Sequence, residues 1–373
     1  MFFKDIIGQE EIKQRLIHSV QNNHIAHAQL FAGPEGTGKF QLALAYARYI
    51  QCTDRGVTDA CGLCPSCVKY GKFMHPDLHF VFPVLRKSAT TVCYDFIDKW
   101  RQFLTGNRYF SLRDWLLYIG AENQQGGIFV KESDEIIRKL SVKPYESDYK
   151  VMLIWLPERM NEQTANKLLK MIEEPFDKTV LLLVSNEPEE VLGTIQSRSQ
   201  RINVRPVAES EMADALINRY GIDPQQAVNV AHLANGNVMK AMEMMRLSEE
   251  KEYFFNLFVS MMRLAYGRRL KEMKAWSEEV AALGRERQKN FLSYAQAMIR
   301  ENFIFNMRVP GLNYMTPGEN AFSQRFAPFV NERNIEGIME ELGLAEQHIG
   351  QNVNAKMVFF DLALKFIMLL KNG

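Results

Sequence analysis

GPEGTGKF, residues 33–40, is the stretch that decides the fold of this chain. It follows the phosphate-binding pattern G-x-x-x-x-G-K, but Phe40 stands where that pattern has Ser or Thr. The glycines let the backbone turn its N–H groups inward, and Lys39 can reach phosphate oxygens. A helix that begins near Lys39 would direct its positive end at the same anion. We therefore expect a nucleotide-binding segment made of Gly33, Pro34, Glu35, Gly36, Thr37, Gly38, Lys39 and Phe40.

The residues that would hold Mg²⁺ are missing from two separate places. In P-loop NTPases a hydroxyl after the lysine binds Mg²⁺, together with an Asp at the end of a later strand. The best candidate for that strand is the apolar run at 151–155, which suits a central parallel strand. Trp155 and Leu156 stand where Asp-Glu would be expected, and Glu158, in the following turn, is a poor substitute. Together with Phe40, these positions indicate that ATP hydrolysis has been abandoned.

Four of the five cysteines fall within sixteen residues and predict a metal site. They are spaced C-x8-C-x2-C-x2-C, and four thiolates suit tetrahedral Zn²⁺. Because four ligands close the coordination shell, we expect a structural zinc ion. His75 and His79 are spare candidates, and Cys93 is most simply a buried apolar residue. The predicted ligands are Cys52, Cys61, Cys64 and Cys67.

Composition narrows the class of protein. The 373 residues carry 45 Lys+Arg and 44 Asp+Glu, a net charge of +1, which argues against a dedicated, strongly basic nucleic-acid binder. The first ten residues lack the long apolar core of a signal peptide, and the apolar run at 357–370 is interrupted by Asp361 and Lys365. We expect a cytosolic protein with no membrane span.

Strands and helices alternate in the first part of the chain. We expect strands at 28–32, 78–82, 151–155, 179–185 and 201–204, and helices at 9–22, 39–50, 132–140 and 163–174. This order predicts a doubly wound α/β parallel sheet with its ligand site at the carboxyl ends of the strands. Residues 86–127 are aromatic and charged, and they exceed a normal connection, so we expect a helical insertion there.

The strands stop after Pro206. Three short helices at 207–247 predict a small lid, and a helical region follows, with a turn-rich interruption at 309–318. The expected domains are therefore 1–205, 206–247 and 248–373.

Several short segments between residues 6 and 199 form one ordered set. They are IIGQEEI (6–12), IAHAQLFAGPEGTGK (25–39), the four-cysteine spacing, HPDLH (75–79), NKLLKMIEEP (166–175) and TIQSRS (194–199). Together they resemble the AAA+ clamp-loader family of bacterial DNA polymerase III, and most of all its delta-prime branch. The resemblance implies a P-loop AAA+ domain with a zinc module, a helical lid and an all-α C-terminal collar domain for oligomerisation. It also implies one arm of a five-subunit ring that loads a sliding clamp on primed DNA.

The same resemblance implies roles for single residues. Arg198 matches the arginine of the Ser-Arg-Cys element, with Ser199 in place of Cys, which implies an arginine finger reaching a neighbour's ATP. Asn186 ends the strand at 179–185, where the family has its first sensor. Met239 replaces the arginine of the lid sensor. The insertion at 86–127 departs from the family pattern.

These departures favour a non-hydrolysing, delta-prime-like subunit of the polymerase holoenzyme. Its expected partners are the motor gamma/tau and delta subunits, and through the complex the sliding clamp and primer-template DNA. The loop leaves ATP or ADP binding open. Two alternatives remain: a gamma/tau-like ATPase motor, and a zinc-containing DNA-binding protein outside replication. A basic run would serve the last of these: Arg263, Arg268, Arg269, Lys271 and Lys274.

Overall fold

The computed structural model describes residues 1–86, 88, 90–121, 124–307 and 315–371. The chain forms two compact units, Met1–Met244 and Met245–Gly373, which are described in turn.

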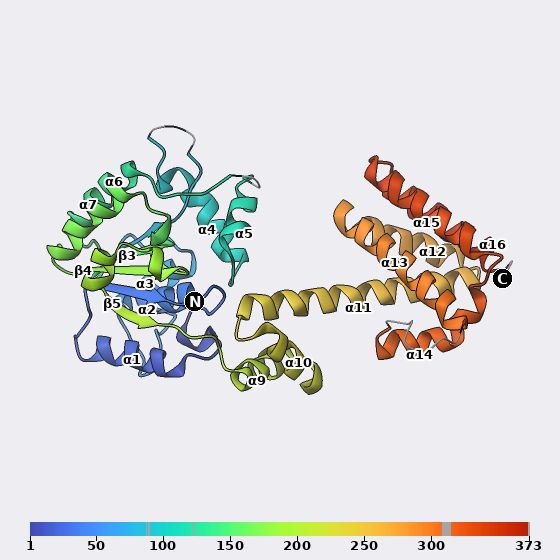
Figure 1. Cartoon of the computed structure of the whole chain (residues 1–373), viewed down its shortest axis with the longest axis horizontal. Helices are drawn as coiled ribbons and strands as arrows, with labels where there is room; N and C mark the ends of the chain where they lie inside the picture. The colour runs from blue at the N-terminus through green and yellow to red at the C-terminus, as the bar shows by residue number, and fades with distance from the viewer. Residues whose placement is uncertain (87, 89, 122–123, 308–314, 372–373) are drawn as a thin grey trace. The chain divides into compact units, whose positions relative to one another are not determined.

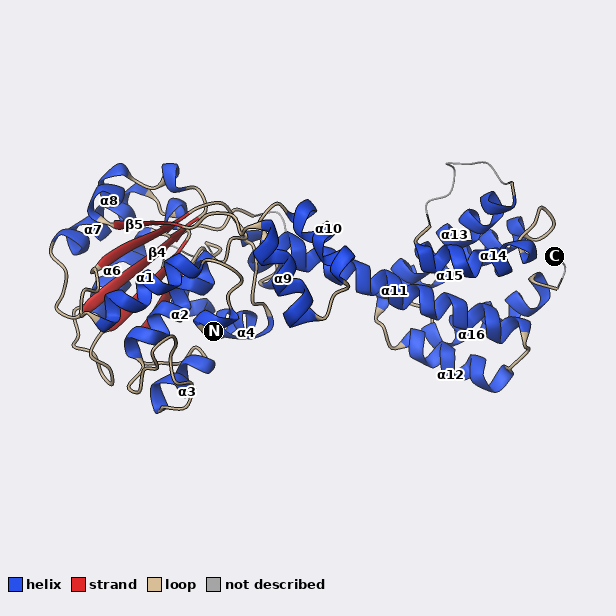
Figure 2. Cartoon of the chain, turned by 90° about the horizontal axis from the view of Figure 1, so that it is seen from below, coloured by secondary structure: helices blue, strands red, loops and turns tan. Residues whose placement is uncertain are grey.

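The first unit is built on a five-stranded parallel sheet (Figures 1 and 2). Its central strands are buried along their whole length, as expected for apolar runs covered on both faces. The predicted parallel α/β sheet is confirmed. In spatial order the strands are β2 (Leu78–Val81), β3 (Lys150–Trp155), β4 (Thr179–Ser185), β1 (Ala28–Ala32) and β5 (Gln200–Asn203).

Helices cover both faces of this sheet (Figure 1). On one face α1 (Glu10–Gln21) packs with α2 (Lys39–Gln51). On the other face α6 (Val130–Leu140) packs with α7 (Glu162–Glu173). The short helix α3 (Pro65–Gly71) follows the cysteine-rich loop.

Residues 86–127 contain the predicted helical insertion. Within their described part, the 3-10 turn Cys93–Phe96 leads into α4 (Ile97–Gly106), and α5 (Leu112–Tyr118) follows after a short turn. Ser111 caps α5 by accepting a hydrogen bond from the Asp114 backbone. The two helices bury Trp100, Phe103 and Trp115 in the core of the first unit, whereas Tyr118 is exposed.

The segment predicted to be a lid, referred to below as the lid, begins with α9 (Glu209–Tyr220) and α10 (Pro224–Ala234), which pack against each other. The third lid helix was predicted to be short, and this is wrong. Helix α11 (Val238–Tyr266) runs for 29 residues through residue 247, because this stretch contains no Gly or Pro to end it. The helix therefore starts in the first unit and ends in the second.

The second unit is helical throughout its described residues and has a core of its own. Most of the interruption predicted at 309–318 lies outside the described residues. In the described part of the chain, no helix is both long and apolar enough to cross a membrane. The helices are the end of α11, α12 (Leu270–Ala281), α13 (Arg285–Asn306), α14 (Pro317–Phe326), α15 (Ile335–Gly350) and α16 (Ala355–Leu369).

Candidate nucleotide and metal sites

The phosphate loop connects the end of β1 to the start of α2, as the motif predicts. Gly36 and Gly38 have φ angles of 80° and 83°, a left-handed backbone that favours glycine. Gly38 is the residue before the first turn of α2. A Cβ on Gly36 would lie 2.0 Å from the Asn237 side-chain oxygen, so the loop is in close contact with the lid.

The Lys39 ammonium group is directed at its own loop. Nζ donates to the Pro34 carbonyl at 2.5 Å and lies 3.5 Å from the Thr37 hydroxyl. Lys39 is only 3% exposed. Burial lowers the pKa of Lys39 to about 8, against the opposing effect of the Glu158 and Glu35 carboxylates. The charge that would meet a phosphate is thus desolvated and partnered within the chain.

Both positions that would hold Mg²⁺ are occupied by buried apolar side chains that contact each other. Phe40 is 6% exposed and Trp155 is 3% exposed. Their ring centroids are 6.2 Å apart in an edge-to-face arrangement, a favourable geometry for aromatic pairs. Leu156, also buried, has a φ of 59°, which is unusual for a residue with a branched side chain.

The insertion adds further aromatic rings to this pair. The Trp100 ring, on α4, lies 5.9 Å from Phe40 and 5.3 Å from Trp155. The Phe110 ring, in the turn before α5, lies 5.2 Å from Phe40 and 5.1 Å from Trp155. The sequence predicted the insertion but not its position beside the phosphate loop. The available signal was that Phe40 and Trp155 would need apolar partners.

Glu158 joins two loops at the edge of this site. Its Oε1 accepts hydrogen bonds from the backbone N–H of Asn186 at 2.8 Å and of Glu187 at 3.3 Å. The Asn186 side-chain amide in turn lies 3.4 Å from a Glu35 carboxylate oxygen. Glu158 therefore caps the end of β4, where the first sensor was expected.

Met239, from the lid, lines a small pocket at the phosphate loop together with Phe40 and Asn186. Lys240 instead donates from Nζ to the Leu233 carbonyl at 2.6 Å. The pocket therefore receives a thioether, not a cation, from the lid.

Arg198 lies apart from the phosphate loop, at the end of α8 (Gly193–Arg198). Its side chain is 43% exposed and its Nε forms an ion pair with Glu173 at 2.8 Å. Nη1 also donates to the Thr194 carbonyl at 3.3 Å. Glu173 comes from the NKLLKMIEEP segment, so the two quoted motifs meet here; sequence reasoning missed this pairing.

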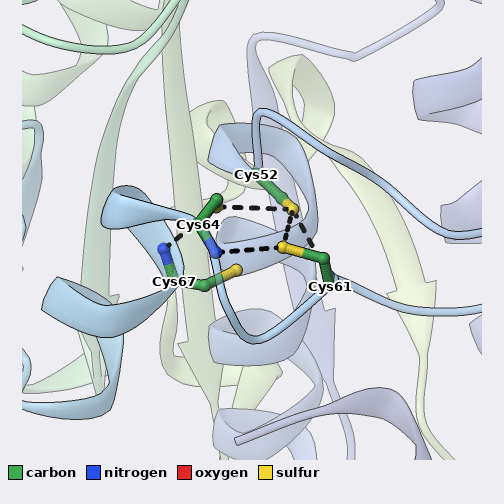
Figure 3. Close-up of side chains that lie close together, drawn as sticks. All are labelled: Cys52, Cys61, Cys64 and Cys67. Carbon is green, nitrogen blue, oxygen red and sulfur yellow. Dashed lines mark hydrogen bonds between the residues drawn. The ribbon is translucent and has the colours of Figure 1, made fainter.

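The four clustered cysteines converge on one point (Figure 3), and their sulfur atoms lie within 4.8 Å of one another. The Cys52 sulfur is 3.6 Å from that of Cys61 and 3.9 Å from that of Cys64. A tetrahedral zinc site with bonds of about 2.3 Å has sulfur atoms roughly 3.8 Å apart. The residues present therefore fit a metal ion, whereas His75 and His79 are not part of this group.

Backbone N–H groups also point at the sulfur atoms. Those of Cys64 and Cys67 lie 3.3 Å and 3.4 Å from the sulfurs of Cys61 and Cys64 (Figure 3). Burial acts to raise the pKa of the Cys64 thiol, but hydrogen bonds from Thr53 and Cys67 outweigh it and lower this pKa to about 6. Such contacts stabilise thiolates, the form in which cysteine binds metals.

Comparisons with known proteins identify the family. The model for the family described as "DNA polymerase III, delta subunit" matches residues 8–208, just over half of the 373 residues. The delta-prime subunit of DNA polymerase III from Bacillus subtilis is 27% identical over 246 residues, 65% of this chain and 61% of that protein. The delta-prime subunit from Pseudomonas aeruginosa is 31% identical over 173 residues, 46% of this chain and 41% of that protein.

Other similar proteins carry different subunit names. The gamma/tau subunit of Mycobacterium tuberculosis is 27% identical over 203 residues, 54% of this chain and 28% of that protein. The chain thus spans less than two thirds of the length of these relatives. Among solved structures, a Bacillus subtilis DNA clamp loader delta protein aligns with 96% of this chain and 99% of its own, at 12% identity and a TM-score of 0.37. The family is identified by the sequence match over residues 8–208. The chain belongs to the DNA polymerase III delta-subunit family.

Proposed function

We propose that this chain is a non-hydrolysing, delta-prime-like subunit of the DNA polymerase III clamp loader. In this role it assembles with gamma/tau motor subunits and a delta subunit, and the complex loads the sliding clamp on primed DNA. The observation that carries the proposal is the contact between Phe40 and Trp155 at the two positions where a P-loop ATPase holds Mg²⁺. Without a hydroxyl and a carboxylate there, the metal that neutralises the transferring phosphoryl group has no anchor.

The alternative is a gamma/tau-like motor, since gamma/tau subunits are among the similar proteins. A phosphate-release assay on the isolated chain with ATP and Mg²⁺ separates the two. We expect no turnover above that of a Lys39→Ala control. Steady turnover that the control abolishes would identify a motor and refute the proposal.

Arg198 is the residue that we propose to act on a neighbour's ATP. Its exposure and its position on α8, away from its own phosphate loop, leave the guanidinium accessible to another subunit. A planar guanidinium neutralises charge on a transferring phosphoryl group, an effect of about 10³–10⁵ in rate in related systems. The Glu173 carboxylate would hold the side chain until the neighbour's phosphates replace it.

We further propose that Cys52, Cys61, Cys64 and Cys67 hold one structural Zn²⁺. The ion would fix the loop between α2 and α3 and would take no part in phosphate chemistry. Metal analysis of protein purified without added zinc should find about one equivalent per chain. Far less than one equivalent in folded protein would exclude a structural zinc site.

The third interpretation, a DNA-binding protein outside replication, depends on a basic run. The members of that run are exposed side chains at the end of α11 and the start of α12: Arg263, Arg268, Arg269, Lys271 and Lys274. A solvated helix face explains them equally well. Strong, salt-dependent DNA binding by the isolated chain would favour that interpretation over ours.

As a replication protein, the chain is proposed to act in the cytoplasm.

A further inference from the structure

The turn between α4 and α5 reaches into the place where a nucleotide would lie. The Phe110 ring packs against Phe40 and Trp155, as described above. The Tyr109 ring lies over the phosphate loop, with Cε1 only 3.7 Å from where a Cβ of Gly38 would be. The Gln41 side-chain amide, on the first turn of α2, donates to the Arg108 carbonyl of the same turn.

The same turn also approaches the lid. Tyr109 and Phe110 line the same small pocket as Met239 of the lid. Arg219, at the end of α9, donates to the Asp5 carbonyl at 3.0 Å, so the N-terminal segment also contacts the lid.

Little space remains around these side chains. The pocket at the phosphate loop has a volume of about 30 Å³. This is far below the ~300–1,000 Å³ of small-molecule sites. Its lining comes from four parts of the first unit: the loop itself (Gly36, Lys39, Phe40), the insertion (Tyr109, Phe110), the ends of β3 and β4 (Trp155, Asn186) and the lid (Met239).

From this geometry we infer that the Tyr109–Phe110 turn is an internal occupant of the nucleotide site, packed against the phosphate loop in place of nucleotide. The inference goes beyond the proposed loss of hydrolysis, since a site without Mg²⁺ ligands can still bind ATP or ADP. It concerns the isolated chain and does not depend on assembly with other subunits.

Burial of aromatic rings favours this position of the turn over an empty site. Phe110 is 7% exposed, and Trp100, which supports it, is fully buried. Entry of a nucleotide would require the Phe110 ring to leave an apolar environment, which is unfavourable. Lys39 would also have to exchange its Pro34 partner for phosphate. The lid should therefore keep one position whether or not nucleotide is present.

Amide hydrogen exchange of the full chain, measured with and without millimolar ADP or ATP, tests whether the turn occupies the nucleotide site. In the parent, neither nucleotide should change exchange at residues 36–39 or in α9 and α10. The double variant Tyr109→Ala/Phe110→Ala should raise exchange at both places by about tenfold or more, because it removes the rings that cover the phosphate loop and line the pocket shared with the lid. Helices α13 and α15 of the second unit should be unaffected and serve as an internal reference.

A matched control comes from the same insertion. Tyr94→Ala removes a ring that is 65% exposed, and should leave the exchange of residues 36–39 and of the lid as in the parent. If the double variant does not fold, Phe110→Leu replaces it and should raise the same exchange rates by a smaller factor. Nucleotide-induced protection in the parent would overturn the inference. So would a folded Tyr109 and Phe110 variant that exchanges like the parent at both places.

Discussion

Phe40→Ser restores the missing hydroxyl of the phosphate loop, and it should weaken the fold without creating an ATPase. Phe40 is 6% exposed and its ring contacts those of Trp100, Phe110 and Trp155. Truncating a buried Phe costs roughly 3–5 kcal/mol, and a buried hydroxyl without a partner adds about 1–3 kcal/mol. We expect a loss of roughly 4–8 kcal/mol in the free energy of unfolding of the first unit. That is a large part of the ~5–15 kcal/mol of a typical domain.

Urea unfolding followed by tryptophan fluorescence measures this loss. Of the four tryptophans, Trp100, Trp115 and Trp155 belong to the core of the first unit and Trp276 to that of the second. A Trp276→Phe background therefore restricts the signal to the first unit. Phe40→Leu is the matched control, since it keeps most of the buried volume and should cost only about 1–2 kcal/mol.

Hydrolysis should stay absent in Phe40→Ser, because Trp155 and Leu156 still supply no carboxylate for Mg²⁺. An unfolding midpoint equal to that of the parent would show that the ring is not packed as described. Phosphate release by Phe40→Ser would show that the hydroxyl was the only missing part, and would refute the reasoning from two independent losses.

Three further predictions concern pH, the metal and the lysine of the loop. Burial, with Lys139 and Lys150 nearby, lowers the pKa of His79 from 6.5 to about 4. As the pH falls, the unfolded chain therefore takes up a proton at a higher pH than the folded chain does. The free energy of unfolding should fall by up to about 3 kcal/mol between pH 6.5 and 4. Urea titrations measure this fall, which should be smaller in His79→Gln. Cys64→Ser should lower the zinc content well below one equivalent and reduce the melting temperature, as measured by metal analysis and calorimetry. Lys39→Ala should leave assembly of the reconstituted complex unchanged, because the ammonium group is buried and its hydrogen bonds go to its own loop; loss of assembly on gel filtration would contradict this.

Local sequence patterns were enough to predict the sheet. The bounds of β1 and β4 agree with the apolar runs at 28–32 and 179–185, since continuous apolar runs bounded by turn residues are typical of buried parallel strands. The phosphate loop and the gathering of four cysteines follow from spacing alone, because their residues are neighbours in the chain.

Contacts between distant segments could not be predicted in the same way. Residues 110 and 40 are far apart in the sequence, and nothing in either segment specifies that their rings meet. The pairing of Arg198 with Glu173 has the same character, as do the backbone contacts of Glu158. The length of α11 was underestimated for another reason: a domain boundary was expected where the helix has no residue to end it.

The steady-state ATPase rate of a reconstituted clamp loader tests the central claim most directly, that a chain with an inactive site serves its neighbour. Complexes built with Arg198→Ala should assemble normally, because an exposed ion pair adds little stability. Their clamp-stimulated hydrolysis should fall by about tenfold or more, with poor rescue by Arg198→Lys, which lacks the planar fork. Arg15→Ala, at another exposed arginine, is the matched control and should hydrolyse like the parent. If Arg198→Ala complexes also hydrolyse ATP and load clamps like the parent, the arginine is only a surface charge and the account is contradicted.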